Sequence, residues 1–194
     1  MPIPADTYIS ADIEADGPIP GKYSMLSFGL TVASTFDGET FEPRDVSSAT
    51  FYRELKPISD EFDPAALAIG GLDRDALARD GAEPADAMAE AAAWVERETA
   101  GTLAVLVGYP LVFDWMFLHW YFVRFLGASP FGFSRALDMK TIHQQKARIT
   151  VGEAGRRDLP AEIASELPHS HNALDDAVEQ GEIFNKLFEW KGPA

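Results

Sequence analysis

Apolar and polar positions along the chain predict strands in the N-terminal part, followed by an alternation of helices and strands. The early apolar segments are short and are bounded by turn residues. These predicted strands lie at residues 7–13, 24–35 and 49–55. The connections between them, a Pro/Gly loop at 15–23 and a polar turn at 36–45, are short, so an antiparallel meander is expected.

The remainder of the chain is mainly helical in pattern. Helices are predicted at residues 64–69, 83–99, 110–125 and 172–190, with another after Asp138, its expected N-cap. Two short apolar segments, 103–109 and 136–138, are predicted as further strands. Residues 148–160 are polar and are predicted as an exposed loop. The whole pattern predicts an α/β fold, with a mixed central β-sheet flanked by helices.

Composition agrees with one domain over residues 1–194. Apolar residues make up 46% of the 194-residue chain, which is enough for a sizeable core, and no repeat or linker interrupts it. The net charge of −15 argues against a protein that coats long nucleic acid through a broad basic face. Residues 135–157 are the one positive stretch, which either guides a nucleic-acid strand or is an ordinary solvated loop.

The chain contains no cysteine, which excludes disulfides and thiolate metal sites. The N-terminus lacks a basic region followed by an apolar run, so no secretory signal is predicted. The most apolar stretch, 111–126, is too short to span a bilayer and contains charged residues. A cytoplasmic protein without membrane association is therefore expected.

Asp12 and Glu14 are the first candidates for a functional site. They are two residues apart on a predicted strand, so their side chains leave the same face. Two neighbouring carboxylates at the end of a buried strand repel each other unless a positive charge lies between them. Asp73 and Asp75 form a rival pair in a region with many other charges.

Asp114 is the second candidate, because it stands near the start of a strongly apolar helix where a lone carboxylate needs a partner. The alternative is an acid in the first helical turn that is favoured by the helix dipole.

His171 and Asp176 are the third candidate pair, one just before the last predicted helix and the other one turn into it. The pattern suits a metal ligand beside a mobile base. His169 competes with His171 and Asp175 competes with Asp176, whereas His119 and His143 are interpreted as structural or surface residues.

Taken together, four acids and a histidine suit phosphoryl transfer. Two metal ions about 4 Å apart can clamp the attacking and leaving oxygens of an in-line displacement. Hard oxygen donors favour Mg²⁺ or Mn²⁺. A histidine with an ordinary pKa of about 6.5 is suited to accept the proton of the attacking water.

These motifs resemble the DEDDh 3'-5' exonucleases of the ribonuclease H-like superfamily, which include proofreading exonucleases, oligoribonuclease and ribonuclease T. The D-x-E motif is similar to Asp12 and Glu14, the F-D-x-x-F-L motif to residues 113–118, and the H-x4-D motif to His171 and Asp176. The resemblance implies a ribonuclease H-like fold and two metal ions bound by the four acids. It also implies that His171 is the general base and that nucleoside 5'-monophosphates are released from 3' ends.

Two departures from that family concern the substrate. A Pro/Gly loop follows Glu14, and Tyr109-Pro110 replaces the family's usual His-Asn before the second motif. Lys22, Tyr23 and Tyr109 are candidates for contacting the terminal nucleotide. The expected partners are 3' ends of single-stranded RNA or DNA, or short oligonucleotides, and a homodimer through the aromatic helix at 111–126 is possible.

Two other functions compete with the exonuclease. One is a metal-dependent hydrolase of small nucleotides or dinucleotides, which the small size and acidity would suit. The other is a catalytically retired domain of the same fold that only binds nucleic acid or protein.

Overall fold

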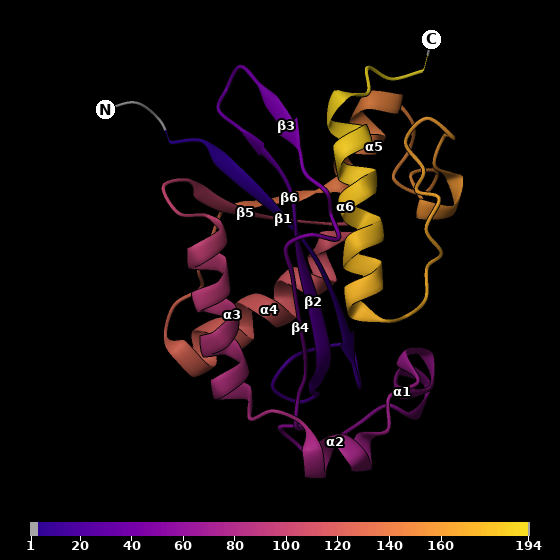
Figure 1. Cartoon of the computed structure of the whole chain (residues 1–194). Helices are drawn as coiled ribbons and strands as arrows, with labels where there is room; N and C mark the ends of the chain where they lie inside the picture. Colours follow the sequence, from indigo (N-terminus) through magenta and orange to yellow (C-terminus); the bar gives the residue numbers. More distant parts are fainter. Residues whose placement is uncertain (1–3, 194) are drawn as a thin grey trace.

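The computed structural model describes residues 4–193, and its centre is a mixed β-sheet (Figure 1). The strands are β1 (Asp6–Ala15), β2 (Met25–Phe36), β3 (Phe41–Pro43), β4 (Thr50–Glu54), β5 (Leu103–Gly108) and β6 (Ala136–Asp138). Their order is β3-β2-β1-β5-β6. β4 also pairs with β2, along residues 27–31, whereas β3 pairs with residues 34–36 of the same strand. The first four strands pair antiparallel, whereas β1, β5 and β6 run parallel. This confirms the predicted mixed sheet.

Helices cover both faces of the sheet (Figure 1). They are α1 (Pro64–Gly70), α2 (Arg74–Asp80), α3 (Pro84–Glu98), α4 (Leu111–Leu126), α5 (Met139–Ala147) and α6 (Ala173–Glu189), with a 3-10 turn, η1 (Arg156–Asp158). Side chains of α3 and α4 share one core with alternate β1 residues, among them Ile9, Ala11 and Ile13. Side chains of α5 and α6 form a second core with Tyr8. Because strand residues alternate between faces, Asp12 and Glu14 lie on the α6 side of β1.

Two elements were not predicted. Within the predicted turn at 36–45, residues 41–43 form β3, whose Phe41 ring stacks on Phe188 at a centroid distance of 4.1 Å. Residues 74–80 form α2, where the Asp73 carboxylate accepts the Ala76 N–H at 2.9 Å. This N-cap gives Asp73 a structural role, and the rival pair with Asp75 forms no acidic cluster with the other candidates among the described residues.

Helix starts agree with the expectations. The Asp138 carboxylate accepts the Thr141 N–H at 2.9 Å at the start of α5, which confirms it as an N-cap. The last helix begins after Asn172, whose side chain caps it. The predicted loop at 148–160 contains η1. No helix of the described part of the chain is long and apolar enough to cross a membrane.

Gly29 on β2 allows the N-terminus of α6 to lie directly on the sheet. A Cβ atom at this position would stand 2.3 Å from the Ala173 carbonyl oxygen and 2.5 Å from the Leu174 Cα. Gly29 is also the register partner of Asp12 on β1. The missing side chain therefore brings the start of α6 close to the end of β1.

Gly29→Ala is expected to destabilise the protein by about 1–3 kcal/mol, because the added methyl overlaps backbone atoms that cannot rotate away. For a chain of this size that lowers the melting temperature by roughly 3–10 °C. The activity that the resemblance implies should fall as well, because the displaced helix carries Asp176. Thermal unfolding and an assay of that activity test this. Gly152→Ala is the control, because its nearest neighbour would be the Thr150 hydroxyl at 3.9 Å; equal effects of the two substitutions would contradict the prediction.

Candidate active site

A cavity of about 750 Å³ opens where β1 and β5 end. Its lining comes from segments far apart in the chain: the end of β1, the start of α4, η1, the loop before α6 and α6 itself. Asp12, Glu14, Asp114 and His171 all line it. The cavity lies beyond the carboxyl ends of parallel strands, where ligands bind in open α/β sheets.

Asp176 joins Asp12 and Glu14 at the base of this cavity. One carboxylate oxygen from each of the three residues lies within 4.8 Å of the others. Asp12 is further held by Gln180, whose amide nitrogen donates to its Oδ1 at 2.7 Å. The structure thus brings together acids separated by more than 160 residues of chain.

Asp114 reaches the same place from the first turn of α4. It is buried, and its Oδ1 accepts the N–H of Ile13 at 3.2 Å, between the two acids of β1. The start of α4 is fixed in turn by Asp138, whose carboxylate accepts the Leu111 N–H at 2.9 Å. A helix-dipole role alone does not account for an acid that is tied to β1.

The acids are electrostatically unfavourable without a cation. Burial, followed by repulsion from Asp114, Asp176 and Glu14, raises the pKa of Asp12 well above its usual range. Burial raises the pKa of Asp114 to about 8, and burial and Asp176 raise that of Glu14 to about 7. Clustered hard oxygen donors with this strain fit divalent cations such as Mg²⁺ or Mn²⁺, because a bound cation offsets the repulsion.

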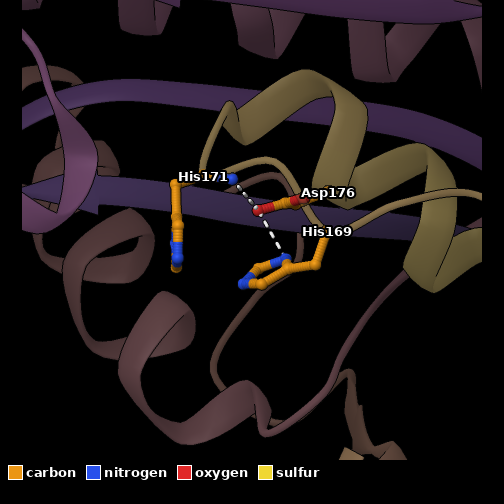
Figure 2. A group of neighbouring side chains, drawn as sticks. All are labelled: His169, His171 and Asp176. Carbon is orange, nitrogen blue, oxygen red and sulfur yellow. Dashed lines mark hydrogen bonds and ion pairs between the residues drawn. The ribbon is translucent and has the colours of Figure 1, made fainter.

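Two histidines flank Asp176, as Figure 2 shows. The backbone N–H groups of Ser170 and His171 donate to the two Asp176 oxygens at 2.8 and 3.0 Å. The His169 Nδ1 lies 2.7 Å from Asp176 Oδ2, and the two imidazole rings are 4.5 Å apart. His171 has a left-handed backbone conformation with φ of 58°, is exposed and lines the cavity. His169 lines it as well, so both histidines are within the site.

The residues that were missed lie on α6 and η1. Gln180 is buried, and its carbonyl oxygen also accepts the Tyr109 N–H at 2.5 Å. Arg156 and Glu179 line the cavity and form an ion pair. Gln180 stands one helical turn after Asp176, a spacing that places both on the same face of the helix and could have revealed it.

The basic stretch at 135–157 is not a single surface, and a role in guiding a strand stays a prediction for the residues of it that line the cavity. The Arg135 guanidinium binds the carbonyls of Pro130 and Phe131, and Lys146 binds three carbonyls at the end of α6. Of the six basic residues in this stretch, only Arg156 and Arg157 line the cavity.

The three candidate substrate contacts differ in their surroundings. Tyr109 lines the cavity, but its hydroxyl donates to the Ala154 carbonyl at 3.0 Å and lies 2.8 Å from His143 Nδ1. Tyr23 packs its ring against Gly17, and the Lys22 ammonium lies 5.1 Å from the centre of that ring. Neither Lys22 nor Tyr23 lines the cavity, so their contact with substrate stays a prediction.

Comparison with known sequences identifies the family. Residues 9–188 match the 3'-5' exoribonuclease Rv2179c-like domain, which is most of the chain. The chain belongs to this family of 3'-5' exonucleases.

Relatives of this exonuclease agree with that placement. The 3'-5' DNA exonuclease Cap18 of Escherichia coli is 39% identical in an alignment that covers 96% of this chain and 95% of Cap18.

Solved structures share the fold. The nuclease domain of 3'hExo, a DEDDh family member bound to rAMP, superposes with a TM-score of 0.68 at 12% identity, over 96% of this chain and 92% of that one. S. pombe Pop2p, in its Mg²⁺- and Mn²⁺-bound form, gives 0.63 at 17% identity, over 92% and 81%. Cell-death related nuclease 4 gives 0.67 at 13% identity over 96% of this chain, which spans 64% of that nuclease. These structures confirm the predicted ribonuclease H-like fold.

The electrostatics of this exonuclease predict how its metal-free form responds to pH. Carboxyl groups whose pKa is raised in the folded state stabilise it below their unfolded pKa of about 4, and this contribution is lost as pH rises through the folded value. Unfolding in EDTA should therefore occur at a lower temperature at pH 9 than at pH 6, because the pKa of Glu14 is about 7 and that of Asp114 about 8.

Asp114→Asn should reduce this loss, since the amide keeps an acceptor for the Ile13 N–H and carries no charge. In EDTA at pH 9 the variant should melt roughly 5 °C above the wild type. Asp60→Asn, at an exposed position, changes the net charge equally and is the control. The same pH dependence in both variants would contradict the prediction.

Proposed function

We propose that this exonuclease releases nucleoside 5'-monophosphates from the 3' end of single-stranded nucleic acid by a two-metal mechanism. Asp12, Glu14, Asp114 and Asp176 would hold two Mg²⁺ or Mn²⁺ ions, with His171 as general base. One observation carries the proposal: oxygens of Asp12, Glu14 and Asp176 lie within 4.8 Å of one another, and Asp12 and Glu14 line a cavity together with Asp114. A retired domain would have no chemical reason to keep these mutually repelling acids together.

The reaction divides the work among the residues of the cavity. When bound, the metal ions would activate the attacking water and stabilise the charge that develops on the phosphate and the leaving oxygen. The water oxygen bonds to phosphorus while the bond from phosphorus to the 3'-oxygen of the preceding nucleotide breaks. A ring nitrogen of His171 takes the proton of the water, and the leaving 3'-oxygen takes one from solvent. The products are a nucleoside 5'-monophosphate and a strand shortened by one nucleotide.

The surroundings of the two histidines favour His171 as the base. Nδ1 of His169 is held by Asp176, whereas only the backbone of His171 contacts that acid. A base must reach the attacking water and then release its proton to solvent; both rings are exposed, so the hydrogen bond between His169 and Asp176 makes the difference. His169 is better placed to orient Asp176, as hydrogen-bonded partners orient metal ligands in other proteins.

Single-stranded DNA is the substrate that we propose first. Similarity to a protein described as a DNA exonuclease extends over 95% of that protein, which supports DNA. The family description refers to an exoribonuclease, which makes RNA the alternative. The sugar is read by contacts to the 2'-hydroxyl, so both polymers belong in the first assay. A homodimer through α4, which exposes Val112, Val123 and Leu126, stays a prediction.

A gel time course with 5'-labelled single-stranded DNA and RNA tests the proposal. With Mn²⁺ the wild type should produce a ladder that shortens from the 3' end, and EDTA should stop it. Asp12→Ala should lower the rate more than about 100-fold. Even the loss of a residue that only hydrogen-bonds to a metal ligand lowers metal affinity or activity about 10–100-fold. Asp60→Asn should leave the rate unchanged. Hydrolysis of dinucleotides without any laddering of longer strands would favour the small-nucleotide hydrolase.

A further inference from the structure

Arg156 places a guanidinium in the cavity that contains the candidate acids. It lies on η1, its side chain is 19% exposed, and it lines the same cavity as Asp12, Glu14 and Asp114. Burial of an arginine is costly unless its donors find partners. Carboxylates that bind metal ions would no longer be free to pair with Arg156. The guanidinium therefore needs another partner.

Two contacts hold the arginine in place. Its Nη2 is 3.1 Å from Oε2 of Glu179, a buried residue on α6. Glu179 stands three residues after Asp176, so both project from one side of α6 toward the cavity. The chain just before Arg156 is anchored at Ala154, whose carbonyl accepts the Tyr109 hydroxyl at 3.0 Å. The ion pair thus holds the guanidinium, and the Ala154 contact holds the backbone two residues before it.

The hydrogen-bonding capacity of Arg156 is largely unused. A guanidinium carries five N–H donors in a planar fork. The Arg156 Nη2 is within ion-pair distance of Glu179 Oε2, but the two atoms do not meet hydrogen-bond geometry. Both atoms are buried, and neither has a hydrogen-bond partner among the described residues. An arginine that served only to neutralise Glu179 would be expected to form a closed, bidentate pair with it. Donors therefore remain for a ligand.

We propose that Arg156 donates hydrogen bonds to a non-bridging oxygen of the scissile phosphate, and that Glu179 positions it. This inference rests on the proposed exonuclease reaction and adds a catalytic residue to it. A planar, permanently charged fork matches a phosphate group. A largely buried, fixed donor at a phosphate oxygen would stabilise the negative charge that accumulates as water adds to phosphorus.

Arg157, the next residue, provides a matched control. It also lines the cavity and carries the same charge, but it is exposed and no ion pair or hydrogen bond of its side chain is found in the described part of the chain. If only positive charge near the cavity matters, substitution of either arginine should lower the activity equally. If Arg156 makes a directed contact with the reacting group, only its substitution should lower the activity.

Two substrates separate a contact at the reacting phosphate from a contact with the upstream strand. One is a single-stranded oligonucleotide, and the other is the 5'-p-nitrophenyl ester of thymidine monophosphate, which has the phosphate but no strand. Hydrolysis of the ester forms the same bond from water to phosphorus and releases p-nitrophenolate. Arg156→Gln should lower kcat about 100- to 1,000-fold on both substrates, the range for loss of a donor to transition-state charge. KM for the oligonucleotide should change less than about threefold.

Further variants control for folding and for charge. Arg156→Gln leaves the Glu179 carboxylate buried without its arginine partner, with only the His169 Nδ1 3.7 Å from its Oε2. The double variant Arg156→Gln/Glu179→Gln, which removes both charges, should therefore melt near the wild type and keep the kcat defect. Arg156→Lys should recover part of kcat. Arg157→Gln should stay within about twofold of the wild type on the ester.

The outcomes distinguish this inference from the proposed function. If the wild type hydrolyses both substrates and Arg156→Gln hydrolyses the ester within about threefold of it, the inference is overturned and the exonuclease stands. A defect confined to KM for the oligonucleotide would also overturn it, because the contact would then lie on the strand. An inactive wild type with added Mn²⁺ would overturn the proposed function and this inference with it.

Discussion

The close approach of α6 to the sheet over Gly29 is the constraint on which the site depends. Only a residue without a side chain fits there, since a Cβ would overlap the backbone of Ala173 and Leu174. The residues of α6 that face the sheet, Asp176, Glu179 and Gln180, then reach the end of β1 together. Gln180 spans the two layers directly, with one amide atom bonded to Asp12 and the other to the backbone at Tyr109.

The packing that forms the core also forces the acids together. Asp114 and Asp176 are buried, and both are bonded to backbone N–H groups, so neither can move away from its neighbours. The raised pKa values of Asp12, Glu14 and Asp114 express a trade-off between stability and function, because the stability lost to burial and repulsion would be recovered if cations bind. Such an arrangement is unfavourable in the free protein and useful in a metal-dependent hydrolase.

An acidic surface is compatible with a nucleic-acid substrate when the contacts are concentrated at one end of the strand. The net charge of −15 makes extended, nonspecific binding of a long polymer unfavourable. Within the cavity, however, bound cations would reverse the local field, and Arg156 adds a positive charge. The protein therefore restricts its attraction for phosphate to the place where the reaction occurs.

The sequence by itself determined the mixed sheet and the starts of most helices, and it named the four acids and His171 as candidates. Those features are local: alternation marks a strand, Asp138 and Asn172 cap the helices that follow them, and each acid stands in a short motif.

Only the tertiary structure decided which distant residues complete the site. Gln180 and Asp12 are 168 residues apart, and their hydrogen bond depends on strand register and on how closely α6 packs, which no local pattern encodes. For the same reason, β3 could not be predicted locally, because its Phe41 packs on Phe188 of α6. The basic stretch is likewise divided by the fold, with Lys146 bound at the end of α6 and Arg156 in the cavity. Local chemistry names the candidates, whereas packing sets the distances between them.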